Sequence, residues 1–159
     1  MIFVTLGTQD KGFERLLEAI QKQIDNGKIK DKVVVQAGYT KFESKDMEIF
    51  DYIVKDEFES FMKTCDILIT HGGVGSIMTG LNAGKKIIAA PRLEKYGEHT
   101  NDHQVQIIDK FDKEGYVIAL EDFDKLDKAY AKAKKMKVKK YKSNTKNLIK
   151  FLDDYIASI

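Results

Sequence analysis

Residues 67–76 read Ile-Leu-Ile-Thr-His-Gly-Gly-Val-Gly-Ser, an apolar run that breaks into glycines before a helical segment ending near Gly84. The apolar run predicts a buried strand. Glycines let backbone N–H groups approach a ligand closely, and the N-terminus of the following helix adds the positive end of its dipole. This order of elements therefore predicts a site for an anionic ligand such as a phosphate.

Short apolar runs alternate with helical periodicities along the rest of the chain. The runs predict strands at 2–6, 32–36, 48–54, 67–70, 86–90 and 116–120. The helical spacings predict helices at 13–24, 57–64, 76–83, 100–113, 122–136 and 144–159. Such alternation is typical of an α/β fold, a parallel sheet with helices on both faces. Right-handed crossovers would bring the loops after residues 6, 70 and 90 to one edge of the sheet, where ligands of such sheets bind.

Composition predicts one soluble globular domain over residues 1–159, with 43% hydrophobic and 33% charged residues. The net charge of +2 gives no reason to expect a nucleic-acid partner. Cys65 is the only cysteine, which excludes an internal disulfide and favours a reducing compartment. The first residues do not resemble a secretory signal and no apolar run is long enough to span a bilayer, so we expect any membrane association to be peripheral.

Two segments late in the sequence each allow two interpretations. Lysines crowd between Lys125 and Lys150, either as a solvated helix face or as a surface for anionic lipid or an acidic partner. Residues 143–159 predict an amphipathic helix whose apolar stripe either packs on the domain or binds a partner. The stripe consists of Leu148, Leu152, Tyr155, Ile156 and Ile159.

The first loop, Gly7-Thr8-Gln9, offers a tight turn and side-chain hydrogen bonds, with Asp10 as a candidate helix cap. It lacks the G-x-G-x-x-G pattern of a dinucleotide fold, and the chain contains no G-x-x-x-x-G-K-[ST]. These absences disfavour nicotinamide, flavin and P-loop nucleotide sites. In the second loop, the three glycines exceed what a packing turn requires, and His71 either bonds a ligand phosphate or fixes the loop.

The loop from Pro91 to Gln104 concentrates side chains that can exchange hydrogen bonds with sugar hydroxyls. His99 and His103 stand four residues apart, but they lack the glutamate of H-E-x-x-H and have no thiolate beside them, so we expect no metal. A helix start capped by Thr100 or Asn101 is the simpler interpretation, and it accounts for only one residue of the loop.

Five motifs occur here in a characteristic order: Phe3–Thr8, Gln36–Gly38, Asp66–Ser76, Gly84–Lys86 and Asp102–Gln104. Together they resemble the carboxyl-terminal half of the family 28 glycosyltransferases, over about Ile2 to Gly115. The likeness is strongest to members that are split into two chains. These are the catalytic subunit of the eukaryotic dolichol-linked N-acetylglucosaminyltransferase and bacterial exopolysaccharide and capsule enzymes.

The resemblance implies the Rossmann-like C-terminal half of a GT-B fold, which holds a UDP-sugar. It implies inverting transfer of a hexose to a lipid-linked saccharide acceptor in exopolysaccharide or capsule synthesis. A membrane-anchored partner subunit would carry the acceptor-binding half and hold this chain at the cytoplasmic face of the cell membrane. No metal or other cofactor is implied besides the donor substrate.

Position by position, the resemblance also implies a donor site. Its residues would be Gly7, Thr8, Gln9, Val54, Lys55, Phe58, His71, Gly72, Gly73, Gly75, Ser76, Thr79, Arg92, Glu98, Asp102, His103 and Gln104. Residues 54–58 would hold the uracil, residues 71–76 the phosphates and ribose, and residues 103–104 the sugar. Thr79 stands where the peptidoglycan member carries a ribose-binding glutamate, and Glu98 is a candidate substitute.

Glycosyl transfer requires a base for the acceptor hydroxyl and stabilisation of the departing UDP. Arg92 or Lys95, with the glycine loop and helix dipole, are candidates for the stabilisation. The resemblance places the base on the acceptor half, and the candidates within this chain are Glu98, His99 and His71. The alternative function is a non-catalytic nucleotide-sugar-binding or scaffold module of a polysaccharide assembly complex.

Overall fold

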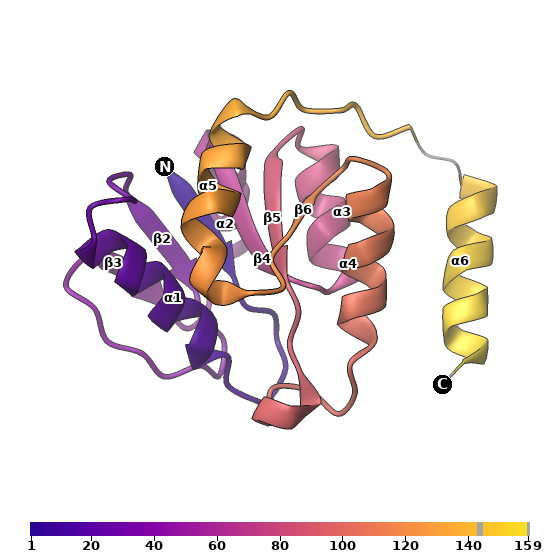
Figure 1. The fold of residues 1–159 in the computed structure, drawn as a ribbon, viewed down its shortest axis with the longest axis horizontal. Helices are drawn as coiled ribbons and strands as arrows, with labels where there is room; N and C mark the ends of the chain where they lie inside the picture. The colour runs from indigo at the N-terminus through magenta and orange to yellow at the C-terminus, as the bar shows by residue number, and fades with distance from the viewer. Residues whose placement is uncertain (143–144, 159) are drawn as a thin grey trace.

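The central strand of the sheet, β1 (Ile2–Thr5), is buried on both of its faces. The computed structural model describes residues 1–142 and 145–158 of the chain. All six strands are parallel and lie in the order β3-β2-β1-β4-β5-β6 (Figure 1). The other strands are β2 (Val33–Gln36), β3 (Met47–Phe50), β4 (Ile67–His71), β5 (Lys86–Ala90) and β6 (Ile118–Ala119). The predicted α/β fold with a parallel sheet is confirmed.

Helices cover both faces of this sheet because alternate strand residues send apolar side chains to opposite sides. Ile2 and Val4 pack with α1 (Glu14–Asp25) and α5 (Leu126–Lys135). Phe3 packs on the other face, which is covered by α2 (Lys55–Thr64), α3 (Val74–Asn82) and α4 (His103–Lys113). Short 3₁₀ helices η1 (Glu94–Tyr96) and η2 (Phe123–Lys125) precede α4 and α5.

Several predicted boundaries were wrong by a few residues. Helix α3 begins at Val74 instead of residue 76, so more of the glycine loop belongs to its first turn. Helix α4 begins at His103 instead of residue 100, because the side chains of His99 and Asn101 bond the backbone N–H groups two residues ahead and form turns there. Strand β6 is reduced to two residues, which pair with β5.

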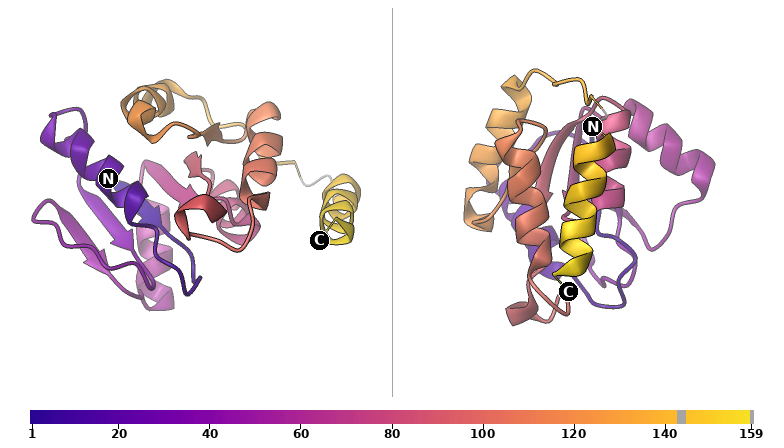
Figure 2. Two further views of the ribbon diagram at one scale, coloured as in Figure 1. Left: turned by 60° about the horizontal axis from the view of Figure 1, so that its bottom comes forward. Right: turned by 90° about the vertical axis from the view of Figure 1, so that its right-hand side faces the viewer.

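The last helix, α6 (Thr145–Ala157), lies beside α3 and α4 and on the far side of them from the sheet (Figure 2). Phe151 and Tyr155 pack against the cluster formed by α2, α3 and α4, whereas Ile149 and Ile156 are exposed. The predicted apolar stripe therefore packs on the domain in part, and its members Leu148 and Ile159 fall outside the described side chains. No helix within the described residues is long and apolar enough to span a bilayer.

The loops after β1 and β2 touch at Gly7 and Gly38, which positions the first loop of the candidate site. Gly38 has a φ of +59°, and a Cβ there would lie 2.6 Å from the carbonyl oxygen of Gly7. Glycine is thus required at residue 38 both for its backbone conformation and for the close approach of the second loop.

The substitution Gly38→Ala should destabilise the domain by about 2 kcal/mol or more, because the left-handed conformation and the contact with Gly7 both resist a Cβ. Gly27→Ala is the matched control, since Gly27 also has a positive φ, +70°, but no atom within 4 Å of a Cβ. It should cost about 1 kcal/mol. Urea unfolding of the two variants measures the difference, and equal losses would contradict the role of the Gly7 contact.

Candidate functional site

A cleft of about 440 Å³ opens at the carboxyl edge of the sheet, where the loops after β1, β4 and β5 meet. The predicted donor-site residues of the first two loops line it, as do Phe58 of α2 and Gln104 of α4. They are Gly7, Thr8, Gln9, Phe58, His71, Gly72, Gly73, Gly75, Ser76 and Gln104, together with His99 from the list of candidate bases. The strand-end geometry expected of a parallel sheet thus brings three distant segments into one site.

The His71 side chain is in close contact with the glycines of the first two loops and holds the glycine loop in place. Its ring is buried, and a Cβ on either Gly7 or Gly73 would lie within 2.6 Å of a ring atom. Its Nδ1 accepts a hydrogen bond from the backbone N–H of Gly73 at 3.1 Å and faces the side-chain nitrogen of Gln104 at 3.2 Å. Of the two roles considered for His71, fixing the loop is the one that these contacts support.

The protonation of His71 follows from its burial. Desolvation by burial and, after it, the nearby charge of Arg92 lower the pKa of His71 from 6.5 to about 4, so the ring is neutral at pH 7. Because Nδ1 accepts, the proton lies on Nε2, which faces the hydroxyl of Ser76 at 3.3 Å. With the ring donating to its oxygen, the Ser76 hydroxyl can turn its own proton toward the cleft.

Gln104 joins the second and third loops. Its carbonyl oxygen accepts hydrogen bonds from the backbone N–H groups of Gly72 and Arg92, both at 3.0 Å. These bonds set the amide orientation, so the nitrogen is the atom that reaches His71. Gln104 therefore holds the loop after β4 and the loop after β5 at a fixed separation.

Arg92, predicted to bind the donor, is fully buried and does not line the cleft. Its guanidinium donates hydrogen bonds to the backbone carbonyls of Leu6, Lys11, Gly12 and Glu98. The prediction that Arg92 faces the donor is not supported, because backbone carbonyls occupy its donors instead.

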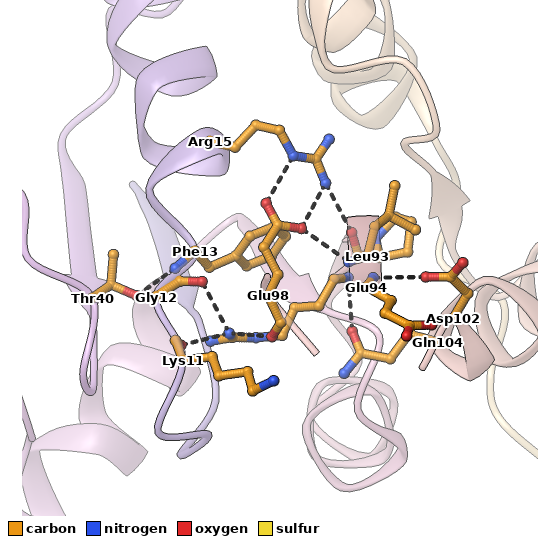
Figure 3. Close-up of polar contacts among 12 residues, drawn as sticks. Lys11, Gly12, Phe13, Arg15, Thr40, Leu93, Glu94, Glu98, Asp102 and Gln104 are labelled. Atoms are coloured by element: carbon orange, nitrogen blue, oxygen red, sulfur yellow. Dashed lines mark hydrogen bonds and ion pairs between the residues drawn. The ribbon is translucent and has the colours of Figure 1, made fainter. Parts of the chain in front are cut away.

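Glu98 is also buried and does not line the cleft. Its carboxylate forms two hydrogen bonds with Arg15, at 2.8 and 2.9 Å, and accepts a third from the backbone N–H of Leu93 (Figure 3). The Arg15 guanidinium stacks over the Phe123 ring at 3.7 Å. This carboxylate is already paired, so Glu98 is not placed to act as a base or to bind ribose.

The other predicted donor residues surround the cleft without lining it. Val54 and Lys55 begin α2, one turn before Phe58. The Thr79 hydroxyl donates to the carbonyl of Gly75 within α3. Asp102 accepts from the backbone of Glu94, and His103 packs edge-to-face on Tyr155.

Four lining residues were not predicted: Thr5, Gln36, Ile107 and Tyr155. Thr5 and Gln36 are the last residues of β1 and β2, so polar residues at strand ends were a usable signal. Their side chains also hold the edge together, since Thr5 bonds Thr70 and Gln36 accepts from the backbone N–H of Ile53. Tyr155 had no comparable signal, because only the docking of α6 brings it to the cleft.

A second hollow, of about 710 Å³, lies between the end of α4 and α6 and shares no residue with the cleft. Lysines and aromatic rings line it. It lacks the glycine loop and the strand ends, so the smaller cleft is the candidate site. Within the described residues, no group of three or more His, Cys, Asp or Glu side chains is arranged to hold a metal ion.

Comparison with known proteins agrees with this geometry. Residues 1–159 match the glycosyltransferase family 28 C-terminal domain. The chain belongs to this family. It is 28% identical over 141 residues to a UDP-N-acetylglucosamine--N-acetylmuramyl-(pentapeptide) pyrophosphoryl-undecaprenol N-acetylglucosamine transferase from Clostridium tetani (strain Massachusetts / E88). The match covers 81% of this chain and 36% of that enzyme, so this family 28 domain spans about a third of its relative.

Solved structures show the same fold. The NMR solution structure of ALG13 has a TM-score of 0.58 and 21% identity, and the match covers 87% of each chain. The crystal structure of the glycotransferase of kitacinnamycin has a TM-score of 0.61 and 17% identity, over 83% of this chain and 34% of that one. This family 28 domain is thus a Rossmann-like sheet of the kind that forms the C-terminal half of GT-B glycosyltransferases.

The buried neutral ring of His71 should make stability depend on pH. The unfolded chain takes up a proton at His71 near pH 6.5, whereas the folded chain resists it until about pH 4. Stability is therefore lost as the pH falls through this range, by up to about 3 kcal/mol.

Urea unfolding at pH 7.5 and 4.5 should show a smaller loss in His71→Asn than in the unchanged protein. Burial also lowers the pKa of His99. Because His99 is present in both proteins, its contribution to the pH dependence cancels in the comparison. Equal losses would contradict this assignment.

Arg15→Ala should destabilise the domain by about 2 kcal/mol or more, because it leaves the Glu98 carboxylate buried without its cation. Lys32→Ala is the control. It breaks the exposed pair with Glu48, at 62% and 44% side-chain exposure, and should cost under about 1 kcal/mol. Thermal unfolding of both variants measures the difference, and a loss for Arg15→Ala no greater than the control's argues against a structural role for this pair.

Proposed function

We propose that this chain is the donor-binding part of a UDP-sugar-dependent glycosyltransferase. It would transfer a hexose, with inversion, to a lipid-linked saccharide acceptor in exopolysaccharide or capsule synthesis, together with a membrane-associated partner that carries the acceptor-binding half. The observation that carries the proposal is the glycine loop, residues 72–75. This loop leads into α3, and the first turn of α3 lines the cleft. The family and the Clostridium tetani relative, a transferase whose name specifies a UDP-sugar donor, support it.

The first turn of α3 suits a diphosphate. The first N–H groups of a helix have no partner within it, and their dipoles favour negative charge. In α3 these groups belong to Val74, Gly75 and Ser76, which all line the cleft. Around Gly75 there is no atom within 4 Å of a Cβ, so a phosphate can come close to the backbone. Because backbone carbonyls occupy Arg92, we assign the stabilisation of the departing UDP to the helix dipole and the Ser76 hydroxyl. We propose that no metal or other cofactor is needed.

The catalytic base is proposed to come from the acceptor half. Nδ1 of His99 accepts from the backbone N–H of Asn101 at 3.3 Å, and its Nε2 faces the Gln9 amide at 3.2 Å. Burial lowers the pKa of His99, which favours the neutral ring, and both ring nitrogens already face N–H groups, those of the Gln9 side chain and the Asn101 backbone. His71 has the same arrangement, as described above. Neither ring therefore offers a free acceptor nitrogen to an incoming hydroxyl.

A non-catalytic nucleotide-sugar-binding or scaffold module remains the second candidate function. The paired state of Glu98, His71 and His99 favours it, because a site without a base can bind a donor and do no chemistry. A transfer assay separates the two. With a UDP-sugar, a lipid-linked acceptor and the partner subunit, the chain should support transfer, and the isolated chain should not.

Titration calorimetry with UDP tests the donor site. Gly75→Asp should weaken UDP binding at least tenfold, by about 1.4 kcal/mol, because its carboxylate would repel the diphosphate at the first turn of α3. Gly75→Ala is the matched control, since the space around residue 75 accommodates a methyl group without contact. It should retain binding within about threefold of the unchanged protein.

Neither substitution should lower the melting temperature. An acidic residue in the first turn of a helix is favourable, and alanine is a better helix former than glycine. No binding of UDP by the unchanged chain at millimolar concentration, or equal binding by the aspartate and alanine variants, would overturn the proposed site.

A further inference from the structure

Tyr155 lines the cleft although it belongs to α6, the element farthest from the glycine loop in the sequence. It shares the lining of the cleft with Ile107 of α4 and the first turn of α3 at Val74–Ser76. Figure 2 shows α6 lying alongside both of these helices. The cleft is therefore lined in part by a residue that the sheet and its connections do not supply.

Two aromatic contacts hold this part of α6 in place. The Tyr155 ring packs edge-to-face on His103 at the start of α4, with centroids 5.2 Å apart and planes at 90°. One turn earlier, the ammonium group of Lys110 lies 5.6 Å from the Phe151 ring. Ile156, next to Tyr155, is 63% exposed, so α6 presents one defined face to the domain and directs Tyr155 toward the cleft.

The contact between Tyr155 and His103 is packing between rings. Among the described residues, Nδ1 of His103 has no hydrogen-bond partner, so it does not engage the Tyr155 hydroxyl. A tyrosine in such a position offers an apolar ring and a hydroxyl donor together. This combination suits a ligand whose phosphate lies at the N-terminus of α3, because the ring excludes water from one side of the phosphate.

We propose that Tyr155 is part of the donor site and contacts the diphosphate end of bound UDP, so that α6 completes the cleft. This inference rests on the proposed function. Its consequence is reciprocal coupling: docked α6 strengthens UDP binding, and bound UDP holds α6 against α3 and α4. The helix is thereby a working part of the nucleotide site as well as a terminal element of the fold.

Calorimetric titration of the full chain with UDP, comparing Tyr155→Ala, Tyr155→Phe and Ile156→Ala, tests this role. Tyr155→Ala should weaken binding about tenfold, and Tyr155→Phe, which keeps the ring and loses only the hydroxyl donor, should weaken it less. Ile156→Ala is the matched control on the same turn and should bind as the unchanged protein does. Binding by Tyr155→Ala within twofold of the unchanged protein, or an equal loss in Ile156→Ala, overturns the role of Tyr155.

Amide hydrogen exchange provides a second measurement that does not depend on the variants' folding. Saturating UDP should slow exchange in residues 149–157 of the unchanged protein, and no change there overturns the coupling. The failures are distinguishable. If the unchanged chain does not bind UDP, the proposed function fails and this inference with it. If it binds UDP and Tyr155→Ala binds equally well, only the inference about Tyr155 fails.

Discussion

The buried guanidinium of Arg92 is the interaction on which the site depends. It reaches backbone carbonyls on both sides of the loop after β1 and one in the loop after β5, and it is fully excluded from solvent. A buried charge is tolerated only when its hydrogen bonds are satisfied, so these loops must stay where the carbonyls meet it. The Glu98–Arg15 pair holds the same third loop from its other side.

Above Arg92, the glycine loop is fixed by neutral side chains. Gln104 binds Gly72 and faces His71, and His71 in turn binds Gly73 and faces Ser76. The result is a set of backbone N–H groups whose positions are determined before any ligand arrives. Donors oriented in advance need no reorganisation when charge develops on a phosphate, which is where such a site gains its strength.

The same hydrogen bonds leave the cleft, within the described part of the chain, with groups suited to binding a ligand and without a free side chain suited to act as a base. The groups that could accept a proton are engaged in holding the loops: Glu98 by Arg15, His71 by Gly73 and His99 by Asn101. The cleft is also lined by a helix N-terminus, hydroxyl groups and aromatic rings, which are groups suited to binding a donor and stabilising a leaving group. A division of labour with a separate acceptor half, as proposed, is consistent with this inventory.

The sequence by itself determined the α/β class, the parallel sheet and the position of the glycine loop, because apolar periodicity and glycine placement act locally along the chain. It also brought the right loops to one edge, since strand direction decides that. Only the tertiary structure decided which polar side chains face the cleft. Arg92 and Glu98 were predicted to bind the ligand, but both are buried. A buried charge must be paired, so Arg92 bonds backbone carbonyls and Glu98 bonds Arg15. Tyr155 entered the cleft through the docking of α6, a long-range contact that no local pattern encodes.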